Sequence, residues 1–247
     1  MDDLIKLFKR RTGYDPDLDN PKTYCEKVTW DKINRRDDRK VTYSDKFWSR
    51  EFIKGKSEAL PMPEPDGYPI VVKPNNYSGR VRIANNEKEL KQAEKGFSNL
   101  PRTYGKEKHE WWYSEIEPKL VYEAYLREFT ELKFFCYDGV ARYIRYRVGK
   151  KSRTFFDIKG NNLHVDEFMY GKNQSPQHEE SIPEFVDLQR MKTAAEKLST
   201  GFDQVRVDLL WSDNKIYFTE FTFAHASGMV QWLPKEHDYR LGEYWKL

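Results

Sequence analysis

Apolar and polar residues alternate with the two-residue period of a β-strand in two segments near the C-terminal end of the chain. In the first segment, Val205, Val207 and Leu209 are separated by polar residues. The second segment, residues 217–222, alternates in the same way. Residues 212–215 between them, Ser-Asp-Asn-Lys, are typical of a turn. The pattern therefore predicts an antiparallel hairpin.

This hairpin gathers polar side chains. Arg206 and Asp208 share one face of their strand, and Glu220 and Thr222 share a face of theirs. If the strands pair in register about the turn, the two faces can coincide. Two neighbouring carboxylates need a cation to neutralise them, and oxygen ligands on adjacent strands suit a Mg²⁺ ion that also holds phosphates. The same residues also fit a structural salt-bridge network on a solvated sheet face.

Apolar spacing predicts the remaining elements. Helices are expected over residues 2–11, 21–34, 45–54, 86–99, 183–199 and 239–246, and strands over residues 68–73, 81–83, 120–126, 131–137 and 141–148. In the helix over residues 45–54, the rings of Phe47, Trp48 and Phe52 are expected to face inward. In the strand over residues 141–148, Arg142 and either Arg145 or Arg147 are expected to face outward. Residues 149–183 are polar and are expected to form a long loop or lid with little regular structure.

The order of these elements indicates an α+β protein. Residues 60–67 contain three prolines and a glycine and read as a linker. We therefore expect a helical N-terminal segment (residues 1–66), a small lobe (residues 67–126) and a large lobe (residues 127–247). In the small lobe, Lys73 ends a strand before a polar loop whose backbone N–H groups can bind an anion. A lysine before a hairpin turn is also structurally ordinary.

Composition narrows the classes of function. The 43 Lys and Arg residues nearly balance the 40 Asp and Glu residues, so charge gives little support for a nucleic-acid partner. Cys25 and Cys136 have no spacing typical of a metal site or disulfide framework, and Cys136 is expected to be a buried small residue. No apolar stretch approaches the roughly 20 residues of a membrane span, so the cytoplasm is the expected location. The cluster Trp111-Trp112-Tyr113 fits either core or lobe packing or a surface on which a glycan or nucleobase stacks.

An ordered set of short motifs resembles the ATP-grasp superfamily, most closely its TupA-like branch, from about residue 20 to the C-terminus. The motifs are Asn20-Pro21-Lys22-Thr23-Tyr24 with Glu26-Lys27, Val72-Lys73 before Ser78-Gly79, Glu123-Ala124-Tyr125-Leu126, Lys133-Phe134-Phe135-Cys136 with Gly139, Gly201-Phe202 with Val205-Arg206-Val207-Asp208, Tyr217-Phe218 with Glu220, and Tyr239-Arg240-Leu241-Gly242.

The resemblance implies that ATP and Mg²⁺ are bound between two antiparallel-sheet lobes. Asp208 and Glu220 match the Mg²⁺ ligands, and Arg206 matches the arginine that contacts phosphate. The nucleotide-binding residues that it implies are Lys73 for the phosphates, Ser78 and Gly79 in the phosphate flap, Glu123, Ala124, Tyr125 and Leu126 in the hinge that reads adenine, Glu131 for the ribose, and Lys133. Thr222 stands where many members have an Asn metal ligand, and residues 224–228 differ near the acceptor site.

The implied activity is that of an ATP-dependent carboxylate–amine ligase working through an acyl phosphate. Arg153 is expected to contact phosphate or the acceptor carboxylate. The TupA-like branch suggests a uronic acid carboxylate of a cell-surface polysaccharide or its sugar precursor, joined to an amino acid or amino alcohol. Two alternatives are a polysaccharide-modifying transferase or kinase, and a non-catalytic module that grips a glycan with Trp111, Trp112 and the strand over residues 141–148. The sequence leaves the oligomeric state open.

Overall fold

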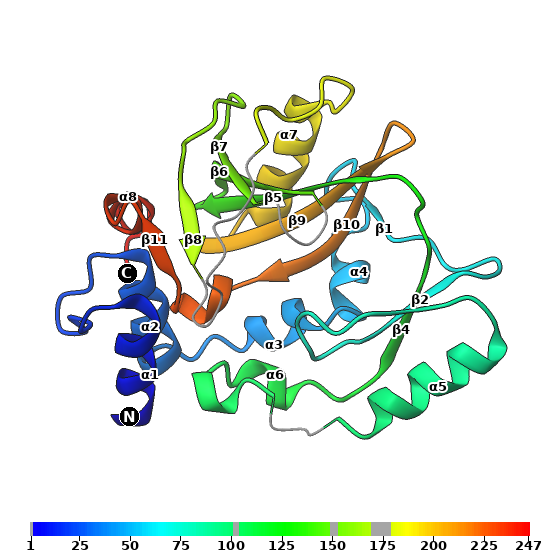
Figure 1. Ribbon diagram of the computed structural model, residues 1–247, viewed down its shortest axis with the longest axis horizontal. Coiled ribbons are helices and arrows are strands. Elements are labelled where there is room, and N and C mark those ends of the chain that lie inside the picture. Colours follow the sequence, from blue (N-terminus) through cyan, green and yellow to red (C-terminus); the bar gives the residue numbers. More distant parts are fainter. Residues whose placement is uncertain (1, 101–103, 149–152, 169–178) are drawn as a thin grey trace.

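The computed structural model describes residues 2–100, 104–148, 153–168 and 179–247, and it is an α+β structure with three sheets (Figure 1). The largest sheet has six strands in the order β1-β10-β9-β5-β6-β7. Its strands are β1 (Leu60–Pro61), β5 (Thr130–Tyr137), β6 (Val140–Arg147), β7 (Thr154–Asp157), β9 (Gln204–Ser212) and β10 (Lys215–Thr222). All neighbouring strands are antiparallel except β1, which pairs parallel with β10. Helix α7 (Leu188–Ser199) packs against β5, β6 and β9.

The second sheet has three strands in the order β3-β2-β4, and Figure 1 shows it below the six-stranded sheet. Its strands are β2 (Ile70–Pro74), β3 (Arg82–Ala84) and β4 (Leu120–Ala124). Helix α5 (Glu87–Ser98) begins at the side-chain cap of Asn86 and packs against β2 and β3. Val72 of β2 and Ala93 and Phe97 of α5 form a small core between the helix and the sheet.

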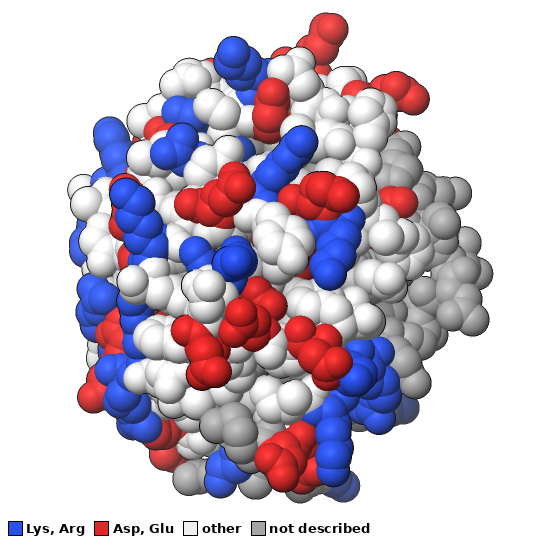
Figure 2. Space-filling view, turned by 90° about the vertical axis from the view of Figure 1, so that its left-hand side faces the viewer, with Lys and Arg blue, Asp and Glu red and all other residues white. Residues whose placement is uncertain are grey.

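The remaining longer helices are α1 (Asp2–Thr12), α2 (Tyr24–Asn34), α3 (Arg39–Ser44), α4 (Trp48–Ile53) and α8 (Glu236–Glu243). Helices α2 and α8, from the two ends of the chain, pack together, whereas α3 and α4 pack against each other and against β10. Helix α2 begins with a capping box between Thr23 and Glu26 and contacts α8. The short elements are η1 (Lys106–Lys108), α6 (Trp112–Glu115), η2 (His225–Gly228), and a two-stranded sheet of β8 (Asp166–Phe168) and β11 (Gln231–Leu233). On the face in Figure 2, acidic and basic side chains are interspersed.

The structure confirms most of the predicted strands and the helices over residues 21–34 and 86–99, but it corrects predictions of four kinds. The described part of residues 149–183 is not a loop throughout, because it contains β7 and β8 and buries Phe155 and Phe156. Leu60 and Pro61, predicted to lie in a linker, form β1. Helix α7 begins at Leu188 instead of residue 183, and the last helix begins at residue 236 instead of 239.

The fourth correction concerns aromatic side chains before and in α4. Phe47 and Trp48 are 41% and 50% exposed instead of facing inward. They contact each other edge to face and lie beside Lys119, whose ammonium contacts both rings. A short helix therefore keeps two large rings at the surface, where the sequence pattern had predicted a buried face.

Trp112, Tyr113 and Cys136 are buried as predicted, and Cys25 is buried as well. Trp112 and Tyr113 lie in the main core, which confirms the core-packing interpretation and leaves Trp112 unable to stack on a glycan. Cys25 and Cys136 are free and buried, and burial raises the pKa of Cys136 to about 12. In the part of the chain that the structure describes, no helix is long and apolar enough to cross a membrane.

Candidate functional site

The predicted hairpin forms, and an irregularity in it positions the acidic residues. Asp213 and Asn214 both have positive φ at the turn, and Phe218 pairs with Leu209. The register then shifts, and Glu220 lies opposite Asp208. Without the extra residue, Thr219 would oppose Asp208, and Glu220 would point to the other face. The bulge at Thr219 therefore brings the two carboxylates onto one face, and the Thr219 hydroxyl donates a 3.1 Å hydrogen bond to the backbone carbonyl of Asp208.

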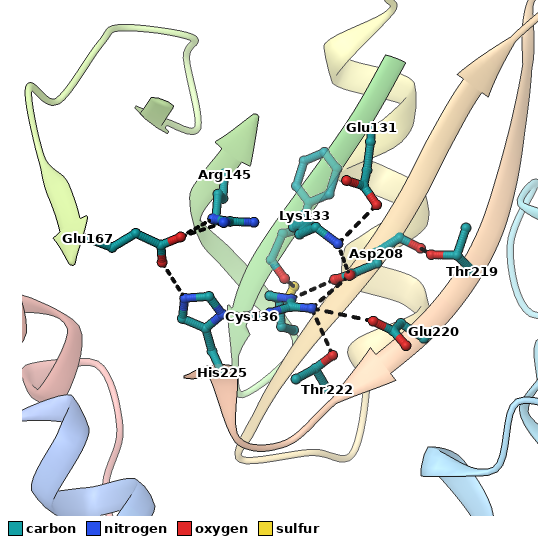
Figure 3. A network of polar contacts seen from close by, with 12 residues as sticks. Glu131, Lys133, Cys136, Arg145, Glu167, Asp208, Thr219, Glu220, Thr222 and His225 are labelled. Atoms are coloured by element: carbon teal, nitrogen blue, oxygen red, sulfur yellow. Dashed lines mark hydrogen bonds and ion pairs between the residues drawn. The ribbon is translucent and has the colours of Figure 1, made fainter. Parts of the chain in front are cut away.

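Asp208 is fully buried and binds two cationic side chains (Figure 3). Its Oδ1 accepts from Nε of Arg206 at 2.6 Å, and its Oδ2 accepts from Nη2 of Arg206 at 2.7 Å and from Nζ of Lys133. Burial alone would raise the pKa of Asp208, but Arg206 and Lys133 lower it below its usual range. This is a buried ion network and not the solvated sheet face that sequence analysis left open.

The guanidinium of Arg206 is held on several sides. Besides Asp208, it donates from Nη2 to Oγ1 of Thr222 at 2.9 Å and from Nη1 to Nδ1 of His225 at 2.6 Å. Its Nη2 also lies 3.6 Å from Oε1 of Glu220. Burial opposes the charge of Arg206, yet Asp208 raises its pKa above the usual range. Arg206 therefore stays charged in a fixed orientation.

Lys46, a residue that sequence analysis missed, connects Glu220 to the loop that follows β2 of the second sheet. Oε2 of Glu220 is 3.4 Å from Nζ of Lys46, and the same ammonium donates a 2.6 Å hydrogen bond to the carbonyl of Tyr77. Burial lowers the pKa of Lys46, with Glu220 opposing this effect. Nζ of Lys73 lies 2.7 Å from Oε1 of Glu123, which also pairs with Arg50 of α4.

A second branch of the network contains three residues that the prediction did not include. Nε2 of His225 lies 2.7 Å from Oε2 of Glu167, and Oε1 of Glu167 accepts from Nε of Arg145 at 2.8 Å. Arg145 is therefore buried and does not face outward, whereas Arg142 and Arg147 are exposed. Arg153 joins this branch with its Nη1 3.7 Å from Oε1 of Glu167.

The implied flap and hinge residues lie at the edges of this network. Ser78 and Gly79 are exposed, and Gly79 has a φ of +72° with open space around it. At the end of β4, the Ala124 N–H donates to the carbonyl of Pro63 at 2.9 Å, and Tyr125 is exposed. Leu126 packs against an apolar cluster of Met62, Leu210 and Tyr217, and Oε1 of Glu131 is 3.0 Å from Nζ of Lys133.

Charge in the network is unbalanced. Among the described residues, seven cationic side chains are set against six carboxylates, with His225 neutral. The cations are Lys46, Arg50, Lys73, Lys133, Arg145, Arg153 and Arg206, and the carboxylates are Glu123, Glu131, Glu167, Asp208, Glu220 and the largely exposed Glu64. A buried excess of positive charge favours an anionic ligand.

The donor set suits Mg²⁺ only if phosphates accompany it. In the described residues, there is no cluster of three or more His, Cys, Asp or Glu side chains arranged to hold a metal. Asp208 and Glu220 supply two hard carboxylate ligands on facing positions, but the oxygens of Asp208 are already bound by Arg206 and Lys133. Phosphate oxygens would take over hydrogen bonds from these cations. The Thr222 hydroxyl already accepts from Arg206.

Sequence reasoning missed Lys46, Arg50, Arg145, Glu167 and His225 as site residues because no local pattern joins them. They come from four separated segments: Lys46 and Arg50 lie just before and in α4, Arg145 lies in β6, Glu167 lies in β8, and His225 lies in η2. The only local signal was the place of His225, three residues after Thr222 in the segment that departs from the family pattern. The tertiary fold brings these side chains together.

Comparison with known proteins gives a family match. The family model described as TupA-like ATPgrasp matches residues 26–246. Comparison with curated proteins gave no significant match.

Among solved structures, an L-amino acid ligase from Bacillus licheniformis is 16% identical, with a TM-score of 0.43, and the match covers 76% of this chain and 42% of that one. A D-alanine–D-alanine ligase from Helicobacter pylori is 15% identical, with a TM-score of 0.47, and the match covers 83% and 62%. A D-alanine–D-alanine ligase from Bacillus anthracis, complexed with ATP, is 16% identical, with a TM-score of 0.37, and the match covers 73% and 56%.

The matches therefore span only about half of the length of these enzymes. The family model matches the sequence over most of the chain, and the match includes both strands of the β9–β10 hairpin. By this match, the protein belongs to the TupA-like ATP-grasp family.

Proposed function

We propose that this protein is an ATP- and Mg²⁺-dependent carboxylate–amine ligase. The observation that carries the proposal is the pair Asp208 and Glu220, which face each other across β9 and β10 beside the guanidinium of Arg206. The excess of positive charge in the same network favours an anionic ligand such as a nucleotide triphosphate. Family membership supplies the independent support.

In the proposed reaction, an oxygen of the substrate carboxylate attacks the γ-phosphorus of ATP, and ADP leaves. An amine then attacks the acyl carbon, phosphate leaves and the amine loses a proton, so that an amide remains. Phosphorylation is needed because a carboxylate is a poor electrophile. The protein mainly positions the reactants and neutralises phosphate charge.

Each part of the site has a proposed role. Asp208 and Glu220 would hold Mg²⁺, which neutralises charge on the phosphates when bound. Lys73 and Arg206 would contact the phosphates, and Lys46, Lys133 and Arg153 add positive charge to the same network. Ser78 and Gly79 would form the phosphate flap, the segment from Glu123 to Leu126 would read adenine, and Glu131 would bind the ribose, while Thr222 would act on the metal only indirectly through Arg206.

The substrates that we propose are a uronic acid carboxylate, on a cell-surface polysaccharide or its sugar precursor, and an amino acid or amino alcohol. This part rests on the TupA-like branch alone. The proposed location is the cytoplasm, where ATP is available.

The test combines ATP, Mg²⁺ and pairs of carboxylates and amines, and measures ADP release. Release should require both substrates, and Mg²⁺-ATP should raise the melting temperature of the protein. Glu220→Gln should lower the rate of ADP release or the apparent affinity for Mg²⁺-ATP by at least tenfold. Glu196→Gln is a matched control, because the Glu196 side chain is 25% exposed, like the 22% of Glu220, but pairs with Lys192 away from the site.

Two results would overturn the proposal. One is a parent protein that neither binds Mg²⁺-ATP nor releases ADP with any pair. The other is ADP release that needs no amine and transfers phosphate to a hydroxyl, which would instead identify a kinase.

A further inference from the structure

The ring of His225 is bonded at both nitrogens, although the proposed chemistry has no role for it. Nδ1 lies 2.6 Å from Nη1 of Arg206. Nε2 lies 2.7 Å from Oε2 of Glu167 (Figure 3). The side chain is almost completely buried. His225 therefore connects the Arg206–Asp208 pair to the Glu167–Arg145 pair, which comes from a different part of the chain.

These contacts determine which nitrogen carries the proton. A guanidinium has only donors, so Nδ1 of His225 must accept from Arg206. The proton then sits on Nε2 and is donated to the carboxylate of Glu167, which Arg145 keeps ionised. Burial, with Arg206 and Arg145 nearby, lowers the pKa of His225 to about 4, although Glu167 opposes this shift. The neutral Nε2–H tautomer therefore persists at neutral pH.

The ring is also held sterically. Phe135 meets it edge to face with ring centroids 5.1 Å apart, and the centroid of Trp232 lies 6.0 Å away. The backbone N–H of His225 donates to the hydroxyl of Tyr24 at 3.2 Å. Nδ1 therefore stays aimed at Arg206, since rotation of the ring would break packing on both sides.

Arg206 has one N–H left for a ligand. A guanidinium carries five N–H donors. Within the described residues, four of them are used: Nε to Asp208, Nη2 to Asp208 and Thr222, and one hydrogen of Nη1 to His225. The remaining hydrogen is on Nη1, the atom that His225 contacts.

We propose that His225, held by Glu167, is a positioning residue that fixes Arg206 so that its remaining Nη1–H points at the phosphoryl group being transferred. The inference rests on the proposed ligase function and adds a supporting pair to the same site. Loss of this support would leave the charge of Arg206 in place but remove the only side-chain contact that the described residues make with Nη1, so that the whole planar guanidinium can tilt on Asp208. Small misplacements of a catalytic group reduce rates by about 100-fold.

Two substitutions of His225 separate positioning from packing. His225→Leu removes both polar contacts, whereas His225→Asn places an amide oxygen close to where Nδ1 lies and keeps the acceptor for Arg206. We expect kcat for ADP release to fall 10- to 100-fold in His225→Leu, with less than a threefold change in KM for ATP. His225→Asn should recover at least a third of the parent kcat. His164→Asn is the control, because His164 is exposed, lies outside the network and has a positive φ that Asn tolerates.

Glu167→Gln tests the tautomer directly. Its amide group can donate to Nε2 and so favour the Nδ1–H tautomer, which would set two donors against each other at Arg206. We expect a loss of kcat as large as that in His225→Leu. The ¹⁵N chemical shifts of the His225 ring should report Nε2–H in the parent and a shift towards Nδ1–H in Glu167→Gln.

The outcomes distinguish the two proposals. No ADP release by the parent protein would overturn the proposed function, and the inference with it. Parent turnover together with an undiminished kcat in His225→Leu, or an Nδ1–H tautomer in the parent, would overturn the inference alone. Equal losses of kcat in His225→Leu and His225→Asn, matched by equal drops in melting temperature, would reduce His225 to a packing role.

Discussion

Asp208 neutralises two buried cations at once, and this makes it different from the other proposed metal ligand. Its carboxylate is completely buried and binds Arg206 and Lys133. The Glu220 side chain is 22% exposed, and its two cationic contacts are longer, at 3.4 and 3.6 Å. The two carboxylates have the same proposed role, but the stability of the fold should depend more on Asp208 than on Glu220.

The stability of two isosteric variants should show this difference. Asp208→Asn leaves two buried cations without their carboxylate and should cost about 3–5 kcal/mol of unfolding free energy, whereas Glu220→Gln should cost less than about 1 kcal/mol. Urea titration of both variants measures the two values. Equal losses would mean that Asp208 is not the structural centre of the network. Activity lost in Asp208 variants must therefore be interpreted alongside their folding.

At the residue scale, the sequence predicted side chains that share a strand but not those that meet through the fold. Arg206 and Asp208 are two residues apart, so strand alternation alone places them on one face. Glu167 and His225 are 58 residues apart, and no spacing rule links them. The strand pattern left open whether Arg145 or Arg147 faces outward, and the contact with Glu167 decides this, because it holds Arg145 inside while Arg147 is exposed.

At the scale of elements, periodicity found helices and strands that have one apolar face, and it failed where burial has another origin. Strand β7 consists of Thr-Phe-Phe-Asp within a polar region. It pairs with β6, and Phe155 is buried against the rings of Phe135 and Trp232. So short a strand shows too few alternations to be recognised. Helix α3 has only six residues and was missed for the same reason.

Two helical glycines should respond to alanine with opposite signs. In α8, a Cβ on Gly242 would lie 2.0 Å from the backbone oxygen of Lys22, so the close approach of α8 to the start of α2 requires glycine. In α5, a Cβ on Gly96 would meet only the end of the Arg82 side chain, at 3.3 Å. Gly242→Ala should cost at least about 2 kcal/mol, and Gly96→Ala should gain about 0.5–1 kcal/mol.

Thermal or urea unfolding of the two glycine variants measures these changes. If both alanines stabilise the protein, α8 does not pack against residues 22–23 as closely as the structure indicates. If both destabilise it, Arg82 cannot move aside from α5.

At the scale of the whole molecule, His237 links stability to pH. It is buried among the rings of Tyr143, Phe155 and Trp232. Burial, helped by Arg240, lowers its pKa to about 4, below the usual 6.5. As pH falls below about 6.5, His237 takes up a proton in the unfolded chain, whereas in the folded protein it stays neutral until about pH 4. The folded state therefore loses stability across this window.

The variant His237→Phe removes this group from the titration and keeps an aromatic ring. Relative to the parent, its unfolding free energy should improve as pH falls from 6.5 to 4, by about 1.4 kcal/mol per pH unit and about 3 kcal/mol in total. The exchange of one ring for another also changes the unfolding free energy, but by the same amount at every pH, so it does not affect this comparison. Urea titrations at half-unit pH steps measure the difference, and parallel curves for the two proteins would contradict the prediction.

The bulge in β10 also determines how the strand tolerates mutation. Ile216 and Phe218 point to the core, but the next core residue is Phe221, and the rings of Phe218 and Phe221 lie only 4.6 Å apart. A saturation scan of residues 215–222 should therefore show sensitive and permissive sites alternating in one phase before Thr219 and in the opposite phase after it. If a homologous sequence is aligned with a one-residue gap at this position, its acidic residue is assigned to the opposite face of the sheet. Such an alignment error would wrongly remove a proposed metal ligand from the site.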